Sequence, residues 1–339
     1  MKQRIPYIDL AKGICILLVV LDHIADNGYF AGGDYPLNEI FEQLRMPLYF
    51  ILSGLFFKDY AGGLREFLLR KTNKILIPYL FFLGLYIGLN KVLRMTLGIS
   101  TGELWAPLWF LLCLYWMNGL FAATYHAIKR CCAGALTADI LLALCMLVFG
   151  TAGYLAGTLP FRLGTALTCV PFLWAGYVLN RRLHLLERRP HWAVSVLLGI
   201  VLLALLQPLY QGENYFYLNS YAAPLPLVWL AGLLGTLGVL QLSSVIRHLP
   251  VISYIGRYSI IVLCTHLAVT KGVIALLHLL PQPQGCLASN TAQSILVLLL
   301  TLSGCIICCH LGRKYLPWFT AQKDLLHIHE LLKTNTPTP

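Results

Sequence analysis

The sequence predicts an all-α fold, a polytopic integral membrane bundle of about ten transmembrane helices with both termini in the cytoplasm. Of the 339 residues, 58% are hydrophobic and only 12% are charged, whereas a soluble domain carries roughly 25% charged residues. The apolar residues form long runs without the strict alternation that the strands of a membrane β-barrel require. Lys and Arg gather in short loops on alternate sides of successive runs. Together these observations favour helices in a lipid bilayer.

Ten apolar runs approach the length of roughly 17 to 25 residues with which a helix crosses the hydrocarbon core. The second run is short, and the even total returns the chain to the side on which it starts. In order, the runs are Ile8–Ala25, Leu44–Phe57, Ile75–Leu93, Pro107–His126, Ile140–Leu155, Leu163–Leu179, Trp192–Leu209, Ala222–Leu242, Tyr254–Leu280 and Ala292–His310.

The distribution of basic residues supports this topology. With the N-terminus in the cytoplasm, 20 of the 25 Lys and Arg residues belong to predicted cytoplasmic loops or termini. The predicted external loops hold only Lys91, Arg94 and Arg162. Because cytoplasmic loops of membrane proteins are enriched in basic residues, we expect a multi-pass membrane protein with both termini in the cytoplasm.

The net charge of +11 does not indicate a nucleic-acid partner. The positive charges are spread over interhelical loops instead of one soluble module, so we expect them to contact membrane lipid. Most of the 11 cysteines lie inside apolar runs, where a thiol packs as a small hydrophobic group. Cys305, Cys308 and Cys309 do not form a haem-attachment motif, because His310 does not directly follow the second Cys of the C-x-x-C pair. We expect no metal site and no permanently bound cofactor.

One membrane domain, residues 1–318, is expected to account for most of the chain, because no internal repeat divides it. Its N-terminal apolar stretch lacks a small-residue cleavage site, so we expect this stretch to be retained as the first helix. The polar residues 319–339 are expected to form a flexible cytoplasmic tail.

The first run carries a polar stripe. Ionisable side chains in membrane helices are costly and mark candidate functional sites. Lys12 and His23 are eleven residues apart, which places them within about 20° on one helix face and about 16 Å apart along the axis. Asp9 and Asp26 each lie three residues from one of these two and can pair with it. Alternatively, Asp9 and Lys12 flank the helix at the membrane interface, and His23 is a packed core histidine.

A second basic group, Arg70, Lys71 and Lys74, precedes the third run in a predicted loop. Lys71 and Lys74 are one helical turn apart. The group could hold phosphates at the cytoplasmic face. The alternative is a topology signal in contact with lipid headgroups.

Three short segments carry the motifs of one known family. Ile8–Gly13 reads I-D-L-A-K-G, and His23 follows its basic residue after ten intervening positions. Leu44–Gly54 is similar to the phrase F-x-MP-x-F-x-x-SG, and Lys71–Lys74 is similar to a basic-x-x-basic pair before Pro78-Tyr79. The sequence thus resembles the acyltransferase-3 superfamily of membrane acyltransferases, which includes many bacterial surface-polysaccharide O-acetyltransferases. Members usually have arginines where Lys71 and Lys74 stand, and lysine lacks the bidentate fork of arginine.

Two further segments resemble the family more weakly. Leu108–Leu111, which contains Trp109, resembles its W-F-L element, and Ile255–Ser259 followed by His266 resembles a late G-x-x-S…H element. The sequence is similar to the fucose 4-O-acetylase-like branch. The resemblance implies a multi-pass protein of a bacterial cytoplasmic (inner) membrane. It also implies that acetyl is taken from cytoplasmic acetyl-CoA, a donor substrate, and placed on a hydroxyl of a glycan or a lipid-linked sugar.

The resemblance implies a role for each candidate residue except Asp26. His23 is the expected catalytic general base, because an imidazole titrates near neutrality. Asp26 is assigned from its spacing and not from the resemblance: three residues from His23, it could orient the ring and stabilise the imidazolium, by the logic of a reduced triad. The expected coenzyme A-binding residues are Lys12, Arg70, Lys71 and Lys74. The candidate substrate-binding residues are Asp9, Arg45, Trp109 and His266.

Two other classes of protein stay open. A multi-pass transporter of a glycan precursor or acyl carrier would also place charged groups inside a helical bundle, but transporters often show inverted repeats, and no convincing halves are found. A glycan polymerase or ligase would favour large external loops, and those predicted here are short.

Overall fold

The computed structural model describes residues 5–30, 38–98, 100–181, 193, 196–197, 199–201, 204, 214–279 and 291–333. Throughout these residues the ordered elements are helices, and the one β-type pairing is an isolated bridge between Tyr215 and Ser220. The main helices are α1 (Pro6–Ala25), α2 (Asn38–Leu55), α3 (Gly63–Lys71), α4 (Ile77–Leu97), α5 (Trp109–Cys131), α6 (Ala135–Ala156), α7 (Leu163–Asn180), α10 (Leu225–Ile246), α11 (Pro250–Arg257), α12 (Ser259–Leu279), α13 (Thr291–Tyr315) and α14 (Ile328–Lys333). Short helical turns are η1 (Thr72–Leu76), η2 (Ala106–Leu108), η3 (Pro160–Arg162) and η5 (Phe216–Leu218).

Seven helices among the described residues are long and apolar enough to cross a membrane. α1 and α2 are 20 and 18 residues long and carry three charged side chains each, which sets them apart from these seven. The predicted run 192–209 lies outside the described residues, apart from single positions. The prediction of a polytopic all-helical membrane protein is therefore confirmed, and the total of about ten spans stays a prediction. The seven helices are Gly63–Leu97, Ala106–Cys131, Ala135–Ala156, Pro160–Asn180, Leu225–Ile246, Ser259–Leu279 and Thr291–Tyr315.

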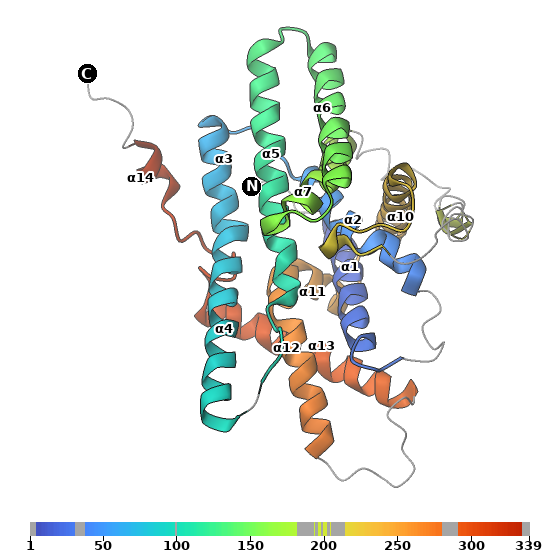
Figure 1. Ribbon diagram of the computed structural model, residues 1–339, viewed down its shortest axis with the longest axis vertical. Helices are drawn as coiled ribbons and strands as arrows, with labels where there is room; N and C mark the ends of the chain where they lie inside the picture. The colour runs from blue at the N-terminus through green and yellow to red at the C-terminus, as the bar shows by residue number, and fades with distance from the viewer. Residues whose placement is uncertain are drawn as a thin grey trace.

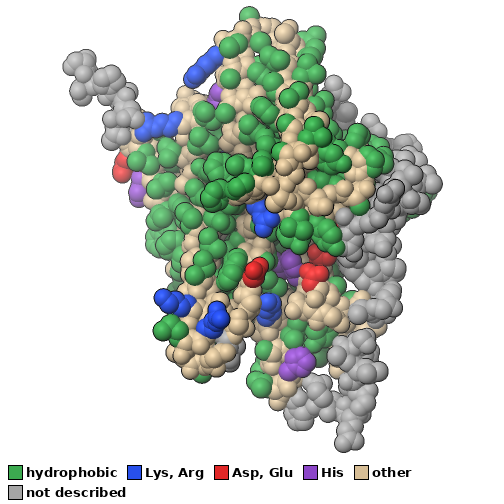
Figure 2. Space-filling model, in the orientation of Figure 1, with side chains coloured by type: hydrophobic (Ala, Val, Ile, Leu, Met, Phe, Trp, Pro, Cys, Tyr) green, Lys and Arg blue, Asp and Glu red, His purple; other side chains and the backbone are tan. Residues whose placement is uncertain are grey.

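The outer faces of several helices expose large apolar side chains. Leu85 and Met95 on α4, Ile140 and Val148 on α6 and Leu299 on α13 are between 47 and 77% exposed. Figure 2 shows a face covered largely by apolar side chains, with Lys and Arg in small separate groups. Apolar surface of this extent is unfavourable in water and favourable against lipid tails. The chain is therefore a multi-pass membrane protein.

α1 lies inside the bundle, where it packs against α2, α10, α11 and α12 (Figure 1). Apolar side chains are buried along the whole length of α1, since Leu10, Cys15, Val20 and Ile24 are all 0% exposed. A membrane-facing helix would instead show one apolar side to lipid. Along the polar stripe of α1, Asp9, Lys12 and His23 are half-buried, and Asp26 at the helix end is exposed.

Two glycines allow α1 and α11 to cross at backbone contact. A Cβ on Gly13 would lie 2.0 Å from the carbonyl oxygen of Ile252, and a Cβ on Gly256 would lie 1.9 Å from that of Asp9. Any larger residue would push the helices apart. Because Gly256 contacts Gly13, the crossing places Lys12 close to the end of α11, where the chain turns into α12.

The predicted ninth span is wrong in one respect. Instead of one helix over Tyr254–Leu280, the chain forms α11 and α12 with a break at Tyr258, whose backbone angles (φ −112°, ψ 27°) leave the helical region. Both helices pack against α1: α11 crosses it, and α12 also contacts it. Apolar character runs through both helices, so the sequence pattern alone does not reveal the break.

The loop predicted around Arg70–Lys74 is also wrong. Arg70 and Lys71 end α3, and Thr72–Leu76 form the π-helical turn η1, which leads directly into α4. A π turn inserts one extra residue and rotates the faces that follow, and such turns are frequent at functional sites. α3 and α4 consequently form one long rod at the edge of the molecule (Figure 1).

The segment after Trp318 lies against this rod as far as the structure describes it, to residue 333. The ring of Phe319 stacks on Phe81 of α4 at a centroid distance of 4.3 Å, and Ile328 is 6% exposed. α14 packs beside α3 (Figure 1). Residues 334–339 are outside the described part, and the division of the chain at residue 318 stays a prediction.

Candidate active site

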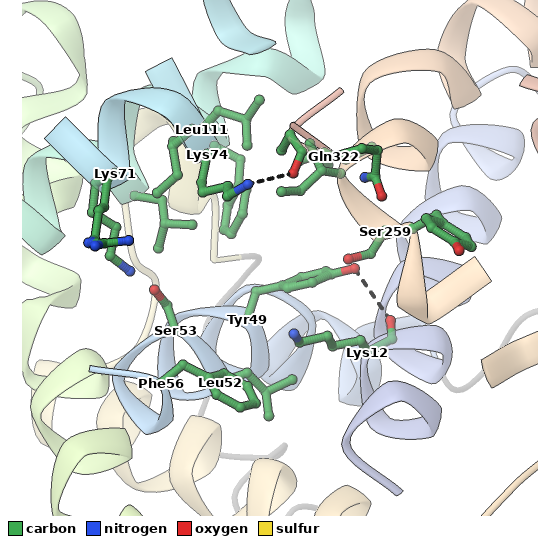
Figure 3. Close-up of a pocket in the computed structure, with 18 of the residues that line it drawn as sticks. Lys12, Tyr49, Leu52, Ser53, Phe56, Lys71, Lys74, Leu111, Ser259 and Gln322 are labelled. Carbon is green, nitrogen blue, oxygen red and sulfur yellow. Dashed lines mark hydrogen bonds between the residues drawn. The ribbon is translucent and has the colours of Figure 1, made fainter. Parts of the chain in front are cut away.

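A cavity of about 450 Å³ lies between the helices (Figure 3). Its walls come from α1, α2, α3, η1, α5, α11, α12 and the segment after α13. The lining residues are Lys12, Tyr49, Leu52, Ser53, Phe56, Tyr60, Phe67, Arg70, Lys71, Lys74, Ile75, Phe110, Leu111, Leu114, Arg257, Tyr258, Ser259, Ile260, Leu263, Ala321 and Gln322.

Five cations line this cavity, and its described lining contains no carboxylate. Four of them are the residues predicted to hold phosphates, and the fifth comes from the end of α11. Like charges that converge on one hollow create a field that attracts anions. The cations are Lys12, Arg70, Lys71, Lys74 and Arg257.

Aromatic rings hold two of the lysines. The Nζ of Lys12 lies 4.6 Å from the ring centroid of Phe56, and the Nζ of Lys71 lies 5.3 Å from that of Phe67. Both Lys12 and Lys71 are half-buried. In Figure 3 the two side chains extend toward Ser53. Ring faces attract cations, so these contacts hold both lysine side chains at the cavity wall.

Arg70 and Lys74 are each paired with a carboxylate. The guanidinium of Arg70 donates from Nε and Nη2 to Oε1 of Glu66, at 2.9 and 2.6 Å, and its Cζ lies 4.6 Å from the ring centroid of Tyr60. Burial raises the pKa of Tyr60 above its ordinary value, so that ring stays a neutral phenol. The Nζ of Lys74 lies 2.9 Å from Oδ1 of Asp324.

The deeper wall of the cavity is apolar. Leu52, Leu111, Leu114 and Leu263 face it from α2, α5 and α12. The hydroxyl of Tyr49 donates to the backbone carbonyl of Lys12 at 3.3 Å, the contact drawn in Figure 3. The cavity thus combines a cationic mouth with an apolar depth, which suits a ligand that has an anionic head and an extended, weakly polar arm.

A second polar cluster lies at the far end of α1. The Nδ1 of His23 is 3.2 Å from Oδ2 of Asp26, and the side chains are 26% and 65% exposed. When Nδ1–H donates to this carboxylate, Nε2 carries the lone pair that can accept a proton. The predicted pairing of His23 with Asp26 is therefore present in the geometry.

His266 joins this cluster from α12. Its ring centroid is 5.1 Å from that of His23, and its side chain is 0% exposed. Nδ1 lies 3.0 Å from the carbonyl oxygen of Val262, and Nε2 is buried without a hydrogen-bond partner among the described residues. Two imidazoles thus face each other inside the bundle.

Arg45 also belongs here, through Asp22, the neighbour of His23. The Nη1 of Arg45 lies 2.5 Å from Oδ1 of Asp22, and Arg45 is 5% exposed. This places Arg45 in the interior and away from lipid. Sequence analysis had not singled out Asp22, although its position next to His23 in an apolar run was a usable signal.

The cavity ends about one helical turn from the second cluster. On α12 the lining reaches Leu263, three residues before His266, and on α2 it reaches Tyr49, four residues after Arg45. One turn corresponds to about 5 Å along a helix. α1 links the two places without interruption, since Lys12 lines the cavity and His23 follows eleven residues later. The separation of about 16 Å is comparable to an extended pantetheine arm.

Two predicted substrate residues lie apart from both groups. Trp109 is half-buried and packs edge-on against Phe110, with ring centroids 6.0 Å apart. Asp9 is half-buried one turn before Lys12, and its carbonyl faces Gly256 at the helix crossing. Neither lines the cavity, although Phe110 and Lys12 do. Their assignment to substrate stays a prediction.

Several lining residues were missed by sequence analysis as ligand contacts. Arg257 stands inside the late family element Ile255–Ser259 but was given no role, and Gln322 falls in the segment predicted to be a flexible tail. Tyr49, Ser53 and Ser259 stand inside the family motifs, which was the only signal for them. The cavity gathers them from positions far apart in the chain, which no local pattern reveals.

The cysteine-rich turn of α13 is separate from both groups. Cys305 and Cys309 are fully buried. Among the described residues, no three His, Cys, Asp or Glu side chains are grouped as a metal site requires. These thiols pack between helices as small apolar groups.

The fold places a cation-lined cavity and a histidine cluster about one helical turn apart inside a multi-pass membrane protein. A family model described as an acyltransferase domain matches residues 5–310, so the chain belongs to the acyltransferase-3 superfamily. The match extends over α1 to α13 and includes both clusters. Comparison with curated proteins and with solved structures found no match. The chain is thus a membrane acyltransferase.

Proposed function

We propose that this protein is an O-acyltransferase of the bacterial inner membrane, which moves acetyl from cytoplasmic acetyl-CoA to a hydroxyl of a glycan or lipid-linked sugar. Within the superfamily, its motifs fit the fucose 4-O-acetylase-like branch. The donor is a substrate, and the proposal needs no resident cofactor or metal because a thioester is already an activated acyl group.

One observation carries the proposal: a cationic cavity with an apolar depth ends one turn from the histidine cluster on two separate helices. Lys12, Lys71 and Lys74, with Arg70, would bind the phosphates of coenzyme A, since charge-assisted hydrogen bonds to phosphate are strong. Arg257 would add a fifth positive charge. The pantetheine arm would follow the leucine-lined wall toward His23.

In the proposed step, Nε2 of His23 removes the proton of the acceptor hydroxyl while that oxygen attacks the thioester carbonyl carbon. The carbon–sulfur bond then breaks, and the thiolate takes up the proton from the imidazolium. The products are the acyl ester and free coenzyme A. Asp26 would orient His23 and stabilise its charged form.

Acceptor binding is proposed at the other face of the same cluster. His266 and Arg45 lie beside His23 and Asp22, where hydroxyl groups of a sugar would find acceptor and donor atoms. Asp9 and Trp109 are further candidates for substrate binding. They would act indirectly, by positioning their neighbours Lys12 and Phe110, which line the cavity. A sugar hydroxyl needs a base near neutral pH, which suits an imidazole at this position.

The test uses purified full-length protein in lipid nanodiscs, with acetyl-CoA and extracted surface glycan. We expect release of free coenzyme A thiol together with a glycan mass increase of one acetyl group. His23→Ala is expected to abolish both. The matched control is His278→Ala, because His278 is an exposed histidine on α12.

A transporter of a glycan precursor or acyl carrier is the alternative. It would give uptake into vesicles without covalent transfer and without thiol release. That result, with His23→Ala still active in uptake, would contradict the proposal.

A further inference from the structure

The segment that follows α13 crosses the rod formed by α3, η1 and α4 and is fixed at two places. At its start, Thr320 is 1% exposed and its hydroxyl donates to the carbonyl of Leu316 at 2.9 Å. Just before it, Phe319 stacks on Phe81. This end of the segment is therefore anchored by packing and by a buried hydrogen bond.

The second anchor is Asn73, which lies inside the π turn η1 between Lys71 and Lys74. Its side chain is 0% exposed. Its Oδ1 accepts hydrogen bonds from the backbone N–H groups of Leu325 and Leu326, at 3.1 and 2.8 Å, and its Nδ2 donates to the carbonyl of Leu326 at 3.1 Å. One carboxamide thus satisfies three backbone groups of a segment about 250 residues away.

Between the anchors, the segment forms part of the cavity wall. Ala321 and Gln322 line the cavity, and Figure 3 shows Lys74 extending toward this stretch. The Nζ of Lys74 donates to the carbonyl of Ala321 at 3.0 Å and pairs with Asp324 at 2.9 Å. Ala321 has φ +59°, a conformation that is unfavourable for a residue with a Cβ and that persists where surrounding contacts enforce it.

The two kinds of contact differ in burial. Lys74 and Asp324 are 45% and 43% exposed, and exposed ion pairs contribute little because water solvates both partners. The Asn73 contacts are enclosed by protein. A phosphate can therefore replace Asp324 as the partner of Lys74 when the two side chains rotate. The backbone of Leu325 and Leu326 keeps its hydrogen bonds to Asn73.

We infer that residues 319–326 are part of the donor site: Asn73 holds them as its outer wall, and Asp324 is the resident counter-ion on Lys74 that an anionic donor displaces. The inference rests on the proposed function for the identity of the donor. Asp324 then sets donor affinity and favours a ligand with phosphate groups, because a neutral ligand leaves the Lys74–Asp324 pair intact.

The experiment measures binding of free coenzyme A to the purified full-length protein by equilibrium dialysis. Asp324→Asn is expected to lower the Kd about two- to fivefold, the range set by an exposed ion pair. In a Lys74→Ala background the same substitution is expected to have no effect. Glu330→Gln is the matched control, because Glu330 is an exposed carboxylate of the same segment.

An unchanged or raised Kd for Asp324→Asn would overturn the inference, as would an equal decrease for Glu330→Gln or in the Lys74→Ala background. Inorganic pyrophosphate, used as a second probe, separates the two proposals. If pyrophosphate binds more tightly to Asp324→Asn and coenzyme A does not bind, Asp324 is still the counter-ion of Lys74, but acyl-CoA is not the donor. Binding of neither probe overturns both.

Discussion

The guanidinium of Arg45 on α2 meets the carboxylate of Asp22 on α1 at 2.5 Å, one residue before the candidate base His23. Arg45 is 5% exposed, so this pair fixes α1 to α2 from the interior. It also places a fixed positive charge near the cluster formed by His23, Asp26 and His266. The conformation of the proposed acyl-transfer site thus depends on an ion pair between two helices.

Breaking this pair from one side is expected to destabilise the protein. Asp22→Ala leaves the buried guanidinium of Arg45 without this carboxylate, which costs about 3 kcal/mol. We expect the apparent Tm in detergent to fall by about 5 °C or more. The double variant Asp22→Leu with Arg45→Met should lose less than the single variant, because it leaves no buried charge behind. Equal losses for single and double variants would contradict a direct pairing.

The lysines of the cavity are expected to act on donor binding and little on turnover. Lys71→Ala and Lys74→Ala should each raise KM for acetyl-CoA about tenfold or more, since a hydrogen bond to a charged group contributes about 1.5 kcal/mol or more. kcat at saturating donor should change little. Lys58→Ala is the control, because Lys58 is exposed and does not line the cavity. A fall in kcat with unchanged KM would argue against phosphate binding.

Asp26 and His23 are expected to act as a unit. His23→Ala should lower kcat by about 10²- to 10⁴-fold. Asp26→Asn should lower it less, about tenfold, because Asp26 is 65% exposed and water can replace part of its interaction. In a His23→Ala background, Asp26→Asn should cause no further loss. An additive loss in the double variant would show that Asp26 acts independently of the ring.

The crossing of α1 and α11 is expected to tolerate no side chain. Gly256→Ala places a Cβ within 1.9 Å of the Asp9 carbonyl, and overpacking of this kind costs about 1–3 kcal/mol or more. We expect a lower Tm and a raised KM for the donor, because Lys12 shifts with α1. Gly84→Ala is the matched control, since nothing lies within 4 Å of the added Cβ. Similar behaviour of the two variants would be incompatible with the close crossing.

Much of the fold could be predicted from the sequence because lipid imposes a simple rule on helix length and charge. Seven of the predicted spans correspond to apolar helices in the described residues or contain one. The errors arose where local geometry breaks a uniform apolar pattern. Tyr258 interrupts the ninth span, and the π turn at Thr72–Leu76 continues a helix through residues whose charges suggested a loop.

The candidate site was predictable where its residues share one segment. Helical spacing on α1 and the basic pair around Asn73 predicted Lys12, Lys71 and Lys74, which the structure brings to one cavity. Arg257 and Gln322 enter that cavity from distant parts of the chain. Arg257 stands inside the late element Ile255–Ser259, which was its only signal. Gln322 belongs to no motif, and only tertiary packing brings it to the cavity.

The most direct test separates binding from chemistry along α1, and it measures coenzyme A binding and acetyl transfer on the same purified variants. His23→Ala is expected to bind coenzyme A with the affinity of the wild type and to transfer no acetyl. Lys71→Ala is expected to bind it more weakly and to transfer acetyl at saturating donor. Loss of coenzyme A binding in His23→Ala, or wild-type affinity in Lys71→Ala, would contradict a donor cavity at one end of α1 that feeds a base at the other.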